Sequence, residues 1–392
     1  MKRRSLIIIF VAVLFATFFT CNFTTVKADG QNDAEKELNE NIDKIIGDID
    51  FGELDEYIKD IDGAIISQSS VSRLLKKLIK GDGIGDYDSV FKYLFSLIFS
   101  GIKENLLVFV SLFVILVVCS VTGCFGSEKL EGVGELTRLI GFSIVACIVA
   151  SLGVTVVESA KSACEKLVKT VQGCFPFLLA FITASGGTAQ SAVYSPSTLF
   201  IQNFITSFIC KITFPCVTTM LALSIISNIN KEIKIKGFIE FLSGFMKWVT
   251  GLVGAVFTVF TAVKGFSAGV VDGIGIRTLK YAVGSSIPLV GGILSGGADV
   301  ILSAFILTKN AFGIFMLILI FGAVISPIVE TAALTLSLRL LGAITQPITD
   351  ERTYFFIKSC VSALNHALAG LVLVAVMYAV NVLVMIAASG VV

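Results

Sequence analysis

The stretch PLVGGILSGGADVIL, residues 288–302, decides how this chain is interpreted. Its neighbours on both sides are apolar enough for lipid, yet it contains one proline, four glycines and the carboxylate of Asp299. Proline removes a backbone donor, and adjacent glycines lower the helix propensity. Backbone groups freed in this way find no hydrogen-bond partner in lipid, so such a segment must face protein or a water-filled cavity.

The composition of the whole chain is that of a membrane protein. Hydrophobic residues make up 55% of the sequence, charged residues make up 15%, and the mean hydropathy is +0.91. A soluble domain carries about a quarter charged residues, whereas several apolar runs here reach the ~20 residues that span a bilayer. The sequence therefore predicts an all-α polytopic integral membrane protein with roughly six to eight transmembrane helices and Gly/Pro-broken segments.

The N-terminal part has the character of an exported segment. Residues 1–28 combine a basic start, a short apolar core and the small-residue sequence VKA, which together predict a signal peptide; an uncleaved anchor is the alternative. Cleavage would leave residues 29–101 as an acidic, helical, exoplasmic segment. Within it, SRLLKKLIK at residues 72–80 has one apolar face and one basic face. Such a helix lies in the headgroup layer or packs on its neighbours, and the sequence leaves both open.

Two ordinary transmembrane helices are predicted within residues 102–160, at 105–124 and 139–157, followed by an amphipathic connector. Beyond the connector we interpret the chain as an internal duplication, with membrane repeat unit 1 at 170–271 and unit 2 at 283–388. Chance likeness between apolar sequences is the alternative. The matching positions, offset by 110 to 112 residues, are Pro176 and Pro288, Gly186 and Gly296, Pro215 and Pro327, Val217 and Val329, and Thr219 and Thr331.

Paired, interrupted apolar segments in corresponding positions are typical of a transporter-like core, where the breaks lie at a binding site or path. Charges inside apolar runs normally face a bundle interior or water, because a charge at mid-bilayer costs about 2.5–3.5 kcal/mol. Close helix packing and structural ion pairing, for example of Glu330 with a lysine, are the alternatives. The candidate path-lining or gating residues are Gly186, Gly187, Pro215, Gly291, Gly292, Gly296, Gly297, Asp299, Pro327 and Glu330.

The number of crossings depends on the first segment of each predicted unit. If that segment crosses the membrane, the chain crosses about eight times and the lysine-rich stretch 229–247 lies outside, against the positive-inside tendency. If it dips in and returns, there are about six crossings and those lysines lie inside, which the rule favours. Both schemes place the C-terminus outside when the signal is cleaved.

Motifs for catalysis and for metal or nucleotide binding are missing from the sequence. The single histidine, His366, has no zinc-protease context, and no phosphate-binding loop of the P-loop type occurs. The nine cysteines include no C-x-x-C pair, and most of them lie in apolar runs, as small buried hydrophobes do. The near-neutral net charge of +1 gives no reason to expect nucleic acid. We therefore expect no enzyme activity, no metal and no cofactor, and we expect His366 and Asn365 to make a helix-packing hydrogen bond.

The order of these features, with SIPLVGGILSGGADVILSAFILTKNAFGIF at residues 286–315, resembles the stage III sporulation protein AE family of endospore-forming bacteria. The likeness covers most of the chain from about residue 105 onward. It implies a component of the transenvelope channel, or feeding-tube, complex between mother cell and forespore that endospore formation requires. It also implies a location in the mother-cell membrane surrounding the forespore, and no catalytic residues.

The partners that this resemblance implies are other stage III sporulation membrane proteins of the same operon, including ring-forming proteins and a secretion-type ATPase, together with a forespore protein. The sequence alone leaves two alternatives. One is a self-contained secondary transporter or permease for a small solute, and the other is a structural scaffold without a path.

Overall fold

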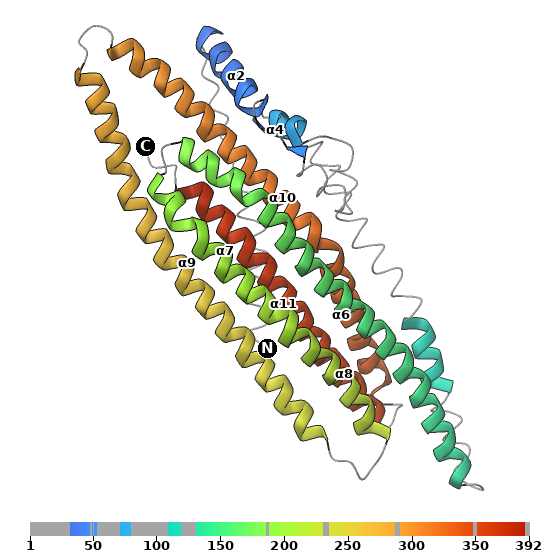
Figure 1. Ribbon diagram of the computed structural model, residues 1–392. Helices are drawn as coiled ribbons and strands as arrows, with labels where there is room; N and C mark the ends of the chain where they lie inside the picture. The colour runs from blue at the N-terminus through green and yellow to red at the C-terminus, as the bar shows by residue number, and fades with distance from the viewer. Residues whose placement is uncertain are drawn as a thin grey trace.

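The described part of the chain is a bundle of long helices, and it contains no strand. Figure 1 shows a computed structural model in which α6, α7–α8, α9, α10 and α11 lie side by side and successive helices run in opposite directions. The predicted all-α, multi-helix architecture is thereby confirmed. The structure describes residues 32–47, 49, 51–52, 71–79, 109–118, 131–185, 188–229, 235–286, 291–347 and 351–388.

These residues form two short helices and a set of long ones, in addition to the apolar helix Phe109–Val118, which belongs to the first predicted span. The predicted signal peptide lies outside the described residues. The remaining elements are α2 (Asn32–Gly47), α4 (Val71–Ile79), α6 (Glu131–Ala184), α7 (Thr188–Phe208), the π-helix η1 (Ile209–Thr213), α8 (Phe214–Ile229), α9 (Lys236–Ser286), α10 (Gly291–Thr345) and α11 (Glu351–Ala388).

Five helical stretches in the described part are long and apolar enough to cross a membrane. The two longest, each of 46 residues, are about twice as long as one crossing needs. The 54 residues of α6 extend over about 81 Å, whereas the hydrocarbon layer is about 30 Å thick. The amphipathic connector predicted after residue 157 is part of the same helix, because α6 runs through it without a break. The spans are Leu139–Ala184, Ser197–Ser227, Lys236–Val263, Val300–Thr345 and Glu351–Ile386.

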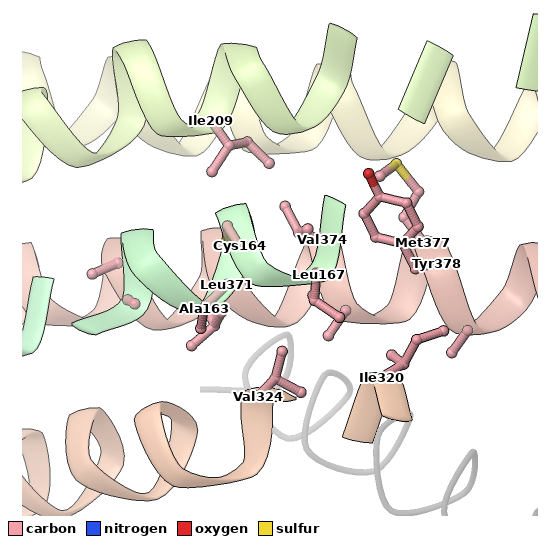
Figure 2. Close-up of a cluster of buried hydrophobic side chains, with 14 of the residues drawn as sticks. Ala163, Cys164, Leu167, Ile209, Ile320, Val324, Leu371, Val374, Met377 and Tyr378 are labelled. Carbon is pink, nitrogen blue, oxygen red and sulfur yellow. The ribbon is translucent and has the colours of Figure 1, made fainter. Parts of the chain in front are cut away.

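The core of the bundle forms where α6, η1, α10 and α11 meet. Figure 2 shows apolar side chains from these four elements pointing toward one another, and all of those labelled are buried. Small residues let the helices approach closely, as they do in other membrane bundles. The labelled residues are Ala163, Cys164, Leu167, Ile209, Ile320, Val324, Leu371, Val374, Met377 and Tyr378.

The short helices α2 and α4 pack on the bundle beside α10 (Figure 1). Val71 and Leu75 of α4 are completely buried. Of the two possibilities left open by the sequence, α4 therefore packs on neighbouring helices rather than lying alone in the headgroup layer. The two helices are joined by a salt bridge of 2.6 Å between Lys76 Nζ and Asp43 Oδ1. This exposed ion pair contributes little to stability, and burial of the apolar faces holds the pair of helices in place.

The predicted breaks have different outcomes in the two predicted units. In the first, α6 ends at Ala184 and α7 begins at Thr188, with Gly186 and Gly187 outside the described residues. In the second, α10 begins at Gly291 and continues through both later glycines and Pro327 as one helix of 55 residues. Gly296, Gly297 and Pro327 therefore do not interrupt α10. The duplication itself stays a prediction.

Candidate functional site

Glu330 is the carboxylate that the structure places best inside the bundle. It lies three residues after Pro327 on α10 and is half-buried. Ser159 of α6 donates a hydrogen bond to its Oε2 over 3.1 Å, and Ser326 donates one to its Oε1 over 3.1 Å. Among the described residues Glu330 makes no ion pair, so two serine hydroxyls take the place of the lysine that structural ion pairing would need. Hydrogen bonds to a charged acceptor are stronger than neutral ones, and Glu330 therefore ties α6 to α10.

Both predicted proline positions share a local hydrogen bond. Thr219 donates to the carbonyl of Pro215 over 2.8 Å, and Thr331 donates to the carbonyl of Pro327 over 2.6 Å. In each case the threonine is four residues after the proline, as the Pro-x-Val-x-Thr pattern requires. These bonds go to the carbonyl of the proline itself, so they do not replace the hydrogen bond that the proline ring removes. Back-bonding of this kind favours a bend in the helix.

The helix before Pro215 is wider than an α-helix. Residues Ile209–Thr213 form a π-helical turn, η1, directly before α8. It lies against Gly370 of α11, where a Cβ atom would come within 3.3 Å of Ile209 Cγ2 and 3.4 Å of Thr213 Cγ2. Lys211, a charged residue within this apolar helix, is in the π-helical turn but is exposed on the outside of the bundle. π-Helical turns occur often at functional sites, and this one marks where the α7–α8 helix contacts α11.

The candidate residues on α10 fall into two separate groups. Pro327 and Glu330 lie well inside α10, whereas Gly296 and Gly297 lie in its first two turns. Thirty residues of helix separate Gly297 from Pro327, which amounts to about 45 Å. The structure therefore does not bring all ten residues to one constriction. Asp299 lies on the same helix, 31 residues before Glu330, so the two positions are also about 46 Å apart along α10.

Sequence reasoning missed Lys309. Its side chain is completely buried, and its Nζ donates a hydrogen bond of 3.0 Å to the carbonyl oxygen of Ile386. That carbonyl belongs to the last turn of α11, where helix carbonyls have no partner within the helix. A cation is favoured at this end by the helix dipole. The feature of the sequence that could have identified it is a lysine within the apolar run FILTKNAFG, residues 305–313.

The single histidine takes part in helix packing, as predicted. His366 Nε2 lies 3.0 Å from the hydroxyl of Ser243 on α9, and that hydroxyl lies 3.2 Å from the hydroxyl of Ser362. Asn365 accepts a hydrogen bond of 2.6 Å from Arg339 of α10. These contacts connect α9, α10 and α11. Together they form a hydrogen-bonding network between the three helices.

Within the described part, the bundle interior offers neutral hydrogen-bonding groups, the carboxylate of Glu330 and the amine of Lys309. No group of three potential metal ligands occurs among the described residues. These groups can hold the helices in register and present polar atoms along them.

Comparison with known proteins gives a consistent result. A family model described as stage III sporulation protein AE matches residues 69–389. The chain is also similar to the stage III sporulation protein AE of Bacillus subtilis (strain 168), with 22% identity over 398 residues, covering 99% of this chain and 98% of that protein. No solved structure matches the chain.

Proposed function

Because this chain belongs to the stage III sporulation protein AE family, which gives it a role in sporulation, we propose that it is a membrane component of a transenvelope channel complex. The complex would join the mother cell and the forespore and be required for endospore formation. The chain would lie in the mother-cell membrane that surrounds the forespore. Its proposed partners are the other stage III membrane proteins of the same operon, including a secretion-type ATPase.

The observation that carries the proposal is the extent of the family match. Residues 69–389 include all five of the candidate membrane spans in the described part. The likeness therefore concerns the whole membrane bundle rather than one span that many proteins share. A multi-pass bundle is what a membrane component of such a complex needs.

The length of the bundle also supports an assembly role. A helix of about 81 Å exceeds the bilayer core by about 50 Å. The part outside the lipid is available for contact with other proteins. A transporter that works alone needs helices only long enough to cross, so the excess length favours a complex over a self-contained transporter.

The proposal is tested by affinity purification of the full chain from sporulating cells. We expect the operon partners to co-purify, and we expect a strain lacking the chain to stop before mature spores form. Purification of the chain alone, combined with solute flux after reconstitution of that chain into liposomes, would instead support the secondary transporter.

A pair of substitutions separates a path from a scaffold. If Asp299 and Glu330 line a path, the double variant Asp299→Asn, Glu330→Gln should reach the membrane and co-purify its partners but reduce spore formation. The matched control is Glu165→Gln, which alters an exposed carboxylate on the outer face of α6. Normal sporulation of the double variant would favour the scaffold.

A further inference from the structure

A line of buried polar side chains follows the inner face of α7, a part of the bundle that the predicted path residues do not include. Thr198, Gln202 and Thr206 are four residues apart, so they lie on successive turns, and they are 1%, 1% and 2% exposed. The hydroxyl of Thr206 lies 3.3 Å from the hydroxyl of Tyr378 on α11, which is also buried. Asn381 is buried one turn farther along α11. We call these five residues the polar seam.

Gln202 stands out within the seam because neither polar atom of its side chain has a hydrogen-bond partner among the residues that the structure describes. A buried polar group that is left unpaired costs about 1–3 kcal/mol. Thr206 does not satisfy it, because its hydroxyl donates to the main-chain carbonyl of Gln202 over 2.8 Å. The side-chain amide of glutamine offers two donors and one acceptor oxygen. A partner outside the polypeptide chain would remove the cost of burying this amide.

The chemistry of the seam limits what that partner is. None of its five side chains is charged at neutral pH, so the seam suits a neutral group that both donates and accepts hydrogen bonds. Buried waters typically make about three hydrogen bonds to groups of this kind. The π-helical turn η1 starts three residues after Thr206, and irregular turns in membrane helices are tolerated where they adjoin protein or water.

We propose that the polar seam between α7 and α11 is a water-binding site centred on Gln202. It makes a hydrated position within the bundle. The seam also lies where α7 of predicted unit 1 contacts α11 of predicted unit 2, which is the position that binding sites take in repeat-built transporters. The inference concerns the isolated chain, so it is independent of the proposed assembly and of its partners.

Radiolytic hydroxyl-radical footprinting of the purified full chain in water enriched in oxygen-18 tests the site, because radicals form at bound water. The reporters are Tyr378 and its neighbour Met377, and the control is Met316 of α10; all three are 1% exposed or less. If water is bound, the reporters should be oxidised faster than Met316. Equal rates for reporters and control would overturn the proposal, and this comparison needs no variant.

The variant Gln202→Met gives a second measurement. It removes the amide while keeping a side chain of similar length, so oxidation of Tyr378 and Met377 should fall toward the rate of Met316. The melting temperature of the variant should also fall, because the water loses its main partner. A rise in the melting temperature would show instead that Gln202 is dry and unpaired, and an unchanged oxidation pattern would likewise refute the site.

Discussion

Replacing Gly370 probes the contact between α11 and the π-helical turn. A Cβ atom at this position would lie 3.3 Å from Ile209 Cγ2 and 3.4 Å from Thr213 Cγ2. Carbon atoms prefer separations of about 3.5–4.0 Å, so alanine is slightly crowded there. Alanine also gains about 1 kcal/mol over glycine in helix propensity. The two effects oppose each other, and we expect Gly370→Ala to change the free energy of unfolding by less than about 1 kcal/mol.

Leucine at the same position needs space that the contact does not have. Overpacking a buried helix contact costs about 1–3 kcal/mol. The matched control is Gly251→Leu on α9, because a Cβ atom at Gly251 meets nothing within 4 Å. Both variants gain similar helix propensity, so the difference between them isolates the crowding. We expect Gly370→Leu to be less stable than Gly251→Leu by about 1–3 kcal/mol.

The assay is thermal unfolding of the detergent-purified proteins, followed by the loss of the monodisperse peak in size-exclusion chromatography. For a chain of 392 residues, 1 kcal/mol corresponds to about 1 °C in the midpoint. Gly370→Leu should therefore melt about 1–4 °C below Gly251→Leu. Equal midpoints for the two leucine variants would show that α11 does not lie against the π-helical turn as described, and the packing argument would fail.

Three further predictions concern other parts of the bundle. Phe51, four residues after α2, is buried and its ring packs against Phe177 of α6 and Phe312 of α10. Phe51→Ala should therefore release α2 from the bundle at a cost of about 3–5 kcal/mol, seen as faster proteolysis of the N-terminal segment while the membrane core stays intact. Unchanged cleavage would show that this ring does not hold α2 in place. Lys309→Ala should leave the Ile386 carbonyl without its hydrogen-bond donor and speed amide hydrogen exchange in the last turn of α11. Unaltered exchange there would show that Lys309 does not stabilise the end of this helix. The variant Lys358→Cys, near the lysine-rich end of the bundle, should react with an impermeant maleimide only after the membrane is opened. The variant Thr183→Cys should react from outside. The reverse labelling pattern would show that the bundle has the opposite orientation in the membrane.

The sequence was sufficient for the fold class and for much of the helix order. Apolar runs and a low content of charge predicted a polytopic helical protein, and the break around Gly186 does separate α6 from α7. The extent of α6 was not predictable in the same way. Its central residues, such as Glu158 and Lys169, are charged and exposed, and a charged stretch between apolar runs is typical of a connector. The helix continues because its opposite face stays apolar and buried against α10 and α11.

Prediction of the candidate site was less complete. Pattern alone identified Glu330 as an interior carboxylate, but its partners are serines on α6 and α10 that carry no recognisable motif. Lys309 was overlooked, since only the packing of α10 against the end of α11 shows why a lysine is tolerated there. Gln202 carries no signal in the sequence either, because a single glutamine in an apolar helix is common on a surface. Its burial depends on tertiary contacts that one sequence does not encode locally.

The excess length of α6 has a consequence for how the protein meets its surroundings. Helices tilt by up to about 40° in membranes, and even at that angle a rod of about 81 Å stands roughly 30 Å clear of the lipid. A neighbour could therefore be engaged at a distance from the headgroups, where lipid composition and surface charge have little influence. In a nanodisc, the helices of the chain alone should therefore extend visibly beyond the surface of the lipid disc.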